Sequence, residues 1–129
     1  MNLKKNKNKF LVIGSNSFSG SHFVDYALKN KNTVIGVSRS KQPNNVFLPY
    51  KNSKFIKNFK FFKFDKNKNA ISIKNIVIKY KITHIVNFAA QSMVGQSWVK
   101  PEDWYNTNTL GIVKFLNLIR DIKTIKKYV

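Results

Sequence analysis

The sequence predicts an α/β fold in which helices cover a parallel sheet. Short apolar segments rich in β-branched residues alternate along the chain with segments whose apolar residues recur at helical spacing. Strands that alternate with helices pair in parallel and give a layered fold. The hydrophobic share of 43% is enough for a core, and neither a repeat nor a domain boundary interrupts the pattern. We therefore expect one domain over residues 1–129.

The first elements are a buried strand and a helix. Residues 9–14 are almost continuously apolar and end at a glycine, which is typical of a central strand. Residues 19–30 then carry apolar residues on one helical face, and Ser19 or Ser21 is the expected N-cap.

Further strands and helices follow in alternation. The strands are apolar or aromatic, the helices show apolar residues at helical spacing, and prolines with asparagines mark a loop. In chain order these elements are a strand at 33–37, the loop at 41–54, a strand at 58–65, a helix at 70–81, a strand at 83–90, a helix at 101–123 and the opening of a fifth strand at 126–129. A strand that only begins at the last residues suggests the front portion of a longer chain.

Composition excludes several classes of protein. The chain has no cysteine, so it has neither disulfides nor a thiolate metal site, and two histidines far apart in sequence, His22 and His84, give no reason to expect a metal site. No apolar run is long enough to span a bilayer. The basic N-terminus is followed only by the segment FLVIG, which is too short for a signal peptide. We expect a soluble cytoplasmic protein without membrane attachment.

The net charge of +19 has two explanations. A strong positive field attracts phosphates and would suit a nucleic-acid partner. However, Arg39 and Arg120 are the only arginines, the lysines are spread over the whole chain, and Lys, Asn, Ile and Phe are used together, as in AT-rich genomes. The arginine-rich and aromatic-plus-glycine motifs of RNA-binding proteins are absent. We therefore favour compositional bias and keep a basic nucleic-acid-binding protein as an alternative.

The segment GSNSFSG at residues 14–20 has the small residues that a dinucleotide-binding turn needs. Gly14 allows a tight turn, Gly20 lets the helix approach the strand, and the helix N-terminus offers free N–H groups to phosphates. Ser17 occupies the middle position, which usually holds a glycine. It is tolerated if its φ is negative, and its hydroxyl could face a phosphate. An ordinary strand–helix turn is the alternative.

The end of the second strand bears on the choice of cofactor. A residue there, roughly 20 residues after the turn, usually contacts the adenosine ribose, and an acid favours NAD. This chain has Ser38 and Arg39 and no acid at that point. A guanidinium could bind a 2′-phosphate, which indicates NADP, with NAD or a plain surface arginine as alternatives.

The residues resemble the NAD(P)-dependent sugar-nucleotide epimerases and dehydratases, which are extended short-chain dehydrogenase/reductases. Phe18 precedes Gly20 by two residues, as in the family's glycine-rich turn, and the more specific likeness is the segment HIVNFAAQSMVGQSWVKPEDWYNTNTLGIVKFLNLIR. It is similar to the family's fourth strand, Ala-Ala-Gln/Glu-Ser segment, Ser-x-x-x-Pro stretch and Asn-x-x-Gly helix start. These motifs are carried here by Ala89, Ala90, Gln91, Ser92, Ser97, Pro101, Asn108 and Gly111.

The resemblance covers nearly the whole chain and implies a Rossmann-type parallel sheet with helices on both faces, ending after the start of the fifth strand. The Gln-Ser form, together with the Ser-Arg pair after the second strand, leans toward the GDP-mannose and dTDP-glucose 4,6-dehydratases. By that resemblance, the cofactor-binding residues are Gly14, Ser17, Phe18, Ser19 and Gly20 at the pyrophosphate, Ser38 and Arg39 at the adenosine ribose, Asp65 at the adenine, Phe88, Ala89 and Ala90 beside the cofactor, and Asn108 as a brace near the site. The substrate-side residues are Gln91, Ser92 and Ser97.

Some positions depart from the family pattern, and others could have a purely structural role. Lys66 stands where family members often carry a leucine after the aspartate. Phe88 and Ala89 could be plain core, and Asn108 an ordinary helix-start residue.

The family's catalytic tyrosine and the lysine four residues after it would follow the fifth strand, so no catalytic residue is assigned in this chain. The single Tyr-x-x-x-Lys match, Tyr50 with Lys54, lies in the loop before the third strand, and we interpret it as coincidence. In the family, bound NAD(P) oxidises a nucleotide sugar at C4, and water elimination or epimerisation follows.

The resemblance thus implies the N-terminal NAD(P)-binding part of such an enzyme, without the C-terminal substrate part and inactive alone. A homodimer through the helix starting near Pro101 is compatible with it. A stand-alone NADP-binding regulatory module is the other alternative.

Overall fold

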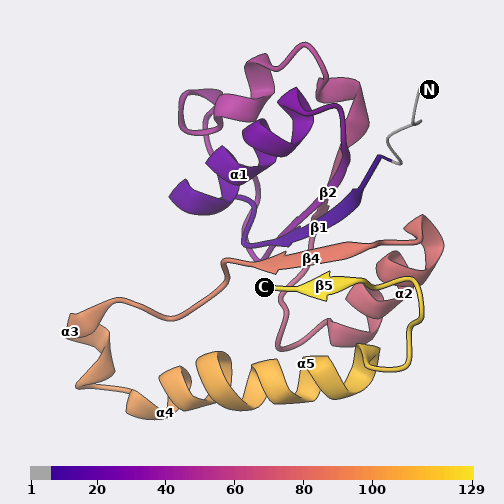
Figure 1. Ribbon diagram of the computed structural model, residues 1–129. Coiled ribbons are helices and arrows are strands. Elements are labelled where there is room, and N and C mark those ends of the chain that lie inside the picture. The colour runs from indigo at the N-terminus through magenta and orange to yellow at the C-terminus, as the bar shows by residue number, and fades with distance from the viewer. Residues whose placement is uncertain (1–6) are drawn as a thin grey trace.

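The computed structural model describes residues 7–129. Most of the basic N-terminus, in which the sequence predicts no signal peptide, therefore lies outside the described residues. Figure 1 shows a sheet with helices on both faces. The sheet has five parallel strands in the order β3-β2-β1-β4-β5. Their bounds are β1 Lys9–Ile13, β2 Thr33–Ser38, β3 Phe59–Lys63, β4 His84–Asn87 and β5 Lys127–Tyr128. The fold class predicted from the sequence is confirmed.

The strand order reverses beside β1. The chain moves from β1 to β2 and β3 on one side, then returns to β4 and β5 on the other. In such sheets a crevice opens outside the carboxyl ends of the strands at the point of reversal. The segments that follow β1 and β4 therefore border the expected ligand position.

The helices bury their apolar faces on opposite sides of the sheet. Helix α1, Phe18–Lys29, covers one face, while α2, Ala70–Tyr80, and α5, Gly111–Ile119, cover the other. Because side chains alternate along β1, Leu11 and Ile13 face the α2 and α5 layer and Val12 faces α1.

The segment between β2 and β3 contributes to the core on the α1 side. The sequence predicts a loop there, and the structure instead contains short 3₁₀-helices at Asn45–Phe47, Pro49–Asn52 and Ile56–Asn58. Leu48 and Tyr50 are fully buried against the layer that includes Val24 and Leu28. Prolines and asparagines indicate irregular backbone but do not reveal that two side chains of this segment are buried.

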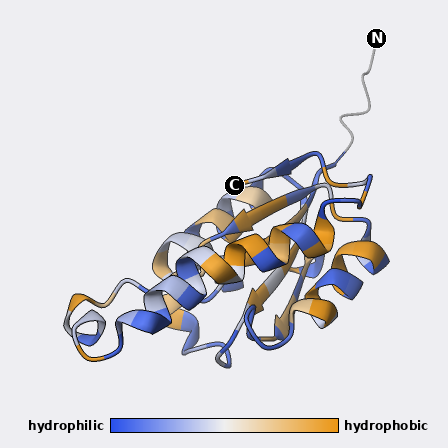
Figure 2. Ribbon diagram, turned by 90° about the horizontal axis from the view of Figure 1, so that it is seen from below, coloured by the Kyte–Doolittle hydropathy of each residue, from blue (hydrophilic) through white to orange (hydrophobic). Residues whose placement is uncertain are grey.

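The predicted helix at 101–123 is a composite. It consists of α4, Pro101–Trp104, a π-helical segment, Tyr105–Leu110, and α5, and it ends at Ile119. Figure 2, seen from below, shows mostly polar residues toward the start of this helical run and apolar ones in α5. A further short helix, α3, Val94–Ser97, precedes it and was not predicted. None of the helices in residues 7–129 has the length and apolarity needed to cross a membrane.

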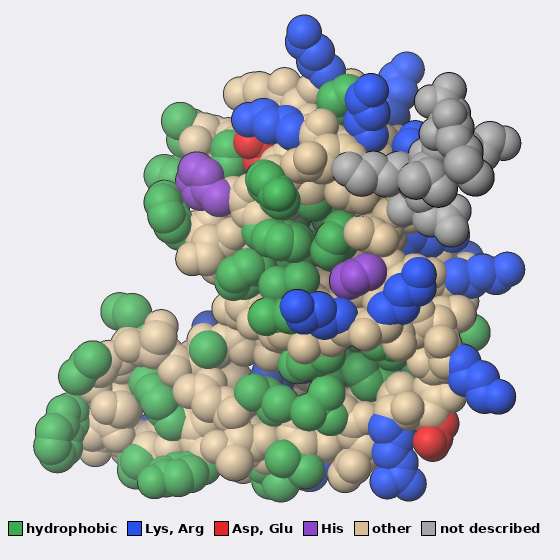
Figure 3. Space-filling view, viewed as in Figure 1, with side chains coloured by type: hydrophobic (Ala, Val, Ile, Leu, Met, Phe, Trp, Pro, Cys, Tyr) green, Lys and Arg blue, Asp and Glu red, His purple; other side chains and the backbone are tan. Residues whose placement is uncertain are grey.

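We call residues 92–110 the arm, because Figure 1 shows α3 and α4 extending beyond the sheet. Figure 3 shows apolar side chains gathered over α3 and along α4 and α5, whereas many Lys and Arg side chains lie toward the other end of the molecule. The exposed large apolar side chains of the arm are Met93, Val94, Trp98, Val99, Tyr105 and Leu110.

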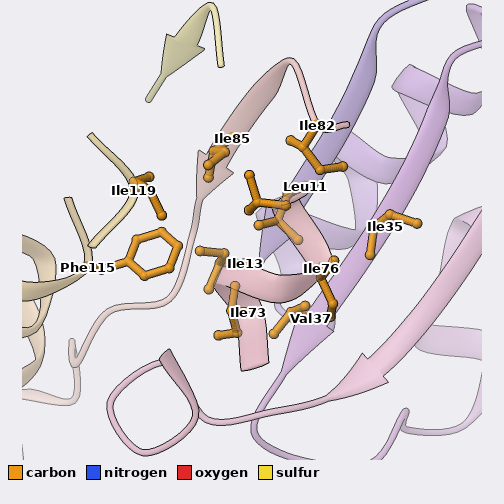
Figure 4. Packing of buried hydrophobic residues seen from close by; sticks show 11 residues of the cluster. Leu11, Ile13, Ile35, Val37, Ile73, Ile76, Ile82, Ile85, Phe115 and Ile119 are labelled. Atoms are coloured by element: carbon orange, nitrogen blue, oxygen red, sulfur yellow. The ribbon is translucent and has the colours of Figure 1, made fainter. Parts of the chain in front are cut away.

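The core beneath α2 and α5 is compact. Figure 4 shows side chains of β1, β2 and β4 converging on those of α2 and α5. Phe115 and Ile119 of α5 meet Ile85 of β4 in the same cluster of buried residues. This core fixes the position of β4 and therefore of the segment that follows it.

Candidate functional site

A cavity of about 250 Å³ opens at the carboxyl ends of β1 to β4. Most of its lining comes from four segments far apart in sequence, each at the end of a strand, and Thr107 of the π-helical segment completes it. The four strand ends contribute Gly14, Asn16 and Ser17 at β1, Ser38, Arg39 and Ser40 at β2, Asp65, Lys66 and Asn67 at β3, and Phe88, Ala89, Ala90 and Gln91 at β4. The cavity therefore lies at the point where the strand order reverses.

Gly14 and Gly20 are required by close backbone approach. Gly14 has a φ of +83°, and a Cβ there would lie 2.8 Å from the backbone N of Ala89. A Cβ on Gly20 would collide with the carbonyl oxygen of Gly14. Gly14 thus brings the end of β1 against the end of β4, and Gly20 lets α1 begin directly on the turn.

Ser17 caps α1. Its φ is −72°, its Oγ accepts a hydrogen bond from the Gly20 N–H at 3.0 Å, and its hydroxyl donates to the Gly14 carbonyl at 2.8 Å. The backbone therefore tolerates a side chain, but the hydroxyl is engaged within the turn. The predicted caps Ser19 and Ser21 were wrong, because the helix begins at Phe18 and Ser17 supplies the cap.

The capping pattern leaves two donors at the start of α1. Within the described residues, the N–H groups of Phe18 and Ser19 have no hydrogen-bond partner, whereas those of Gly20 and Ser21 do. The positive end of the helix dipole adds to these donors. This arrangement suits an anion such as a phosphate group.

Asn16 joins the turn to the end of β2. Its N–H donates to Ser38 Oγ at 3.0 Å, and its side-chain amide donates to the carbonyls of Ser40 and Lys41 at 3.2 and 3.0 Å. Ser38 is nearly buried, whereas Arg39 is exposed and lines the cavity. The sequence analysis overlooked Asn16, although an asparagine in a tight turn is a frequent hydrogen-bonding residue.

Lys66 is the charged residue in this site that sequence reasoning did not assign. Its side chain is 6% exposed, and its ammonium donates to the carbonyls of Ala89 and Thr107 at 3.4 and 3.3 Å. Burial lowers the pKa of Lys66, and the nearby Asp65 carboxylate opposes that shift. The Asp65 carboxylate itself accepts from the Asn67 N–H at 2.8 Å.

Asn108 holds the segment after β4. Its amide donates to the Gln91 carbonyl at 2.9 Å and accepts from the Gln91 N–H at 2.9 Å. The side chain thus forms the two hydrogen bonds to Gln91 that the backbone of a neighbouring strand could form. Asn108 does not itself line the cavity. Its position is that of a brace between the π-helical segment and the cavity wall.

The structure brings together many of the predicted site residues and separates others. Those that line the cavity are Gly14, Ser17, Ser38, Arg39, Asp65, Phe88, Ala89, Ala90 and Gln91. Phe18, Ser19 and Gly20 belong to the first turn of α1 beside it. Ser92 is exposed and Ser97 is half-buried on the arm, and neither lines the cavity. The Ser97 hydroxyl donates to the Val94 carbonyl.

Tyr50 lies away from the cavity. It is fully buried on the α1 side, and its hydroxyl accepts a hydrogen bond from Gln42 at 2.8 Å. Burial raises the pKa of Tyr50, which opposes formation of the phenolate that a general base requires. Within residues 7–129, no group of His, Asp or Glu is arranged to hold a metal ion.

Comparisons with known proteins agree on one family. The model described as GDP-mannose 4,6 dehydratase matches residues 11–129. A UDP-glucuronate 4-epimerase from Thermodesulfobacterium geofontis is 30% identical over 115 residues, which cover 87% of this chain and 35% of that protein.

Solved structures show the same fold. A UDP-glucose 4-epimerase from Thermotoga maritima, determined with UDP-glucose, superposes with a TM-score of 0.75 at 24% identity, covering 93% of this chain and 36% of that one. A dTDP-glucose 4,6-dehydratase from Bacillus anthracis, determined in complex with NAD, gives a TM-score of 0.70 at 25% identity, with 93% and 36% coverage. This chain spans about a third of the length of these relatives.

Proposed function

The chain belongs to the family described as GDP-mannose 4,6 dehydratase, and from this premise we propose that it is the NAD(P)-binding N-terminal part of a sugar-nucleotide dehydratase or epimerase. The observation that carries the proposal is the cavity at the reversal of the strand order, bordered by the Gly14 turn and the start of α1. A dinucleotide is the class of ligand that this arrangement fits.

The residues present fit such a cofactor. The free N–H groups of Phe18 and Ser19 would hold its pyrophosphate, since the close approach at Gly14 and Gly20 keeps the turn clear of side chains at those points. Asp65 would lie by the adenine, and Phe88, Ala89 and Ala90 would lie along the cofactor. The bound nicotinamide would supply the hydride acceptor for oxidation of the sugar at C4.

We infer a preference for NADP over NAD from the end of β2. Ser38, Arg39 and Ser40 line the cavity there, and none of them is an acid that would pair with a free ribose 2′-hydroxyl. The exposed Arg39 guanidinium can bind a 2′-phosphate through a planar pair of hydrogen bonds.

The substrate in the complete enzyme would be a nucleotide sugar, and a 4,6-dehydratase is the specific activity that we propose. Gln91 would face the substrate side, since it lines the cavity and is fixed by Asn108. Ser92 and Ser97 would take part only if the arm approached the cavity. Because Tyr50 is buried elsewhere, this chain alone would bind cofactor without turnover.

Titration of the protein with NADPH and NADH, followed by nicotinamide fluorescence, tests the proposal. We expect both to bind and NADPH to bind more tightly. Arg39→Ala should weaken NADPH binding roughly tenfold and leave NADH unchanged, because a charge-assisted contact is lost. Arg120→Ala, which alters the other arginine, at the end of α5, is the matched control. Absence of binding by either nucleotide would overturn the assignment, and equal loss of NADH and NADPH would overturn only the role of Arg39.

A further inference from the structure

Lys66 differs from the other basic residues of the chain. It is the only Lys or Arg among the described residues that is buried. Neither of the ion pairs formed within residues 7–129 includes it, and its only hydrogen-bond acceptors there are two neutral carbonyls. A buried charge whose direct partners are neutral costs stability, and the nearby Asp65 carboxylate offsets this cost only in part, so the burial of Lys66 needs a reason.

A purely structural role explains Lys66 poorly. At 3.4 and 3.3 Å, its hydrogen bonds to the carbonyls of Ala89 and Thr107 are longer than good N–H···O bonds. The same two segments are already joined by the pair of 2.9 Å bonds between Asn108 and Gln91. Asn67 separately joins the loop after β3 to the π-helical segment, since its amide donates to the Thr107 hydroxyl at 3.1 Å.

Lys66 shares its cavity with the turn that would cradle a phosphate. Lys66 lines the same cavity as Gly14 and Ser17, and it touches Ala89, the residue against whose backbone Gly14 is packed. The ammonium also has one more N–H donor than these two carbonyls use. Arg39, the other basic residue that lines the cavity, follows β2 and so lies at a different strand end from Lys66.

We propose that Lys66 is a ligand-binding residue of this cavity and that its ammonium binds the diphosphate bridge of a bound dinucleotide through the N–H donor that the two carbonyls leave free. The assignment rests on the proposed function. It adds a cation to the neutral N–H donors of α1 at a position that the glycine turn alone would not reveal. Burial strengthens the attraction, because the surrounding dielectric constant is low.

The expected stability effect separates this role from a structural one. Burial lowers the pKa of Lys66 below that of the unfolded chain, so the unfolded state holds the proton more strongly. The cost is fully present at pH values below the folded pKa and is relieved as the pH rises toward the unfolded value. We therefore expect Lys66→Met not to lower the melting temperature at neutral pH, whereas a structural lysine would give a lower one.

The test compares Lys66→Met, Lys66→Gln and wild type by NADPH titration, and by competition of ADP and adenosine against NADPH. Glutamine keeps an N–H donor for the carbonyls but loses the charge. Both variants should bind NADPH and ADP roughly tenfold to a hundredfold more weakly, with adenosine changed by less than about twofold. Lys68→Met, which removes an exposed lysine on the same loop, is the control and should bind NADPH as wild type does.

The outcomes distinguish the two proposals. If wild type binds NADPH and both Lys66 variants bind it equally well, the assignment of Lys66 is wrong and the cofactor proposal stands. Equal weakening of adenosine and ADP would also overturn it, because a variant that merely distorts the cavity would weaken both ligands whether or not they carry phosphate. If wild type binds neither NADPH nor NADH, the proposed function fails and the assignment of Lys66 fails with it.

Discussion

Helices α1 and α5 carry similar apolar patterns but lie in different surroundings. On α1, Val24, Ala27 and Leu28 are all buried between the sheet and the 3₁₀-helical segment. On α5, Phe115 and Ile119 are buried, whereas Val113 and Leu116 remain 51% and 36% exposed. The comparison shows that periodicity identifies the residues that favour burial, and that a second layer of chain is needed to bury them all.

The contrast extends to the neighbouring segments. The turn before α1 is closed by hydrogen bonds between its own residues and by backbone contact with the end of β4. The arm before α5 is held to the rest of the molecule mainly through Asn108 and the loop after β3. We therefore expect substitutions near α1 to affect folding more strongly than equivalent ones in the arm and on α5.

The largest difference is expected between two leucines. Leu28→Ala should lower the free energy of unfolding by about 2–5 kcal/mol, because it leaves a cavity in a fully buried layer. Leu116→Ala removes the same atoms from a partly exposed site and should cost less than about 1 kcal/mol. Urea denaturation followed by circular dichroism measures both, and equal losses would contradict the comparison.

A pair of glycines gives the next effect. Gly14→Ala should lower the free energy of unfolding by about 2 kcal/mol, because φ is +83° and the new Cβ would displace the Ala89 backbone. It should also weaken NADPH binding. Gly95→Ala in the arm meets no atom within 4 Å and should be neutral or stabilise by up to about 1 kcal/mol. Thermal unfolding distinguishes them, and a neutral Gly14→Ala would disprove the need for this turn.

Asn108 tests the junction between the two regions. Asn108→Ala removes both hydrogen bonds to Gln91 and should cost about 1 kcal/mol. Hydrogen exchange should become faster in residues 92–110 and stay unchanged in α1. Asn117→Ala, at an exposed asparagine on α5, is the control and should neither lower the free energy of unfolding nor speed exchange in residues 92–110. Faster exchange in α1 as well would show that the regions are not independent.

The smallest stability effect is expected at Trp98, which is 85% exposed on the arm. Trp98→Ser should change the free energy of unfolding by less than about 0.5 kcal/mol. It should reduce self-association in sedimentation velocity experiments, because it shrinks an exposed apolar surface. Trp104→Ser, at a half-buried tryptophan, should cost more stability, and the opposite order would show that Trp98 is covered in solution.

The fold was predictable because alternating strands and helices with a glycine turn allow few topologies. The N-cap of α1 was harder to predict from the sequence, since several serines lie near the start of the helix. Only the backbone conformation of Ser17 selects the one that reaches the Gly20 N–H. The π-helical segment within the predicted helix at 101–123 contains Thr107, whose hydroxyl accepts a hydrogen bond from Asn67, about 40 residues away. Local secondary-structure propensity cannot predict contacts between residues so far apart in sequence.

For the site, too, local sequence predicted some residues, and long-range packing determined the others. The glycine turn and the end of β2 were predicted from their spacing, the residues after β3 and β4 were predicted from the family resemblance, and most of these residues line the cavity. Lys66 was not assigned, because lysine is abundant throughout the chain and its burial arises from packing against the ends of β4 and the π-helical segment. Ser97 matched a motif, but it lies on the arm, whose distance from the cavity no local pattern encodes.

The central place of β1 also has a consequence for how the sheet assembles. On one side the strand is joined to a partner close in sequence, as in the hydrogen bond from Asn8 to Asn32 across 24 residues, and on the other side Lys9 meets Thr83 across 74 residues. Closing the longer loop costs more entropy, so pairing with β2 should form first. During synthesis on the ribosome, β1 would then present an open hydrogen-bonding edge until β4 emerges, and such an edge favours aggregation of the nascent chain.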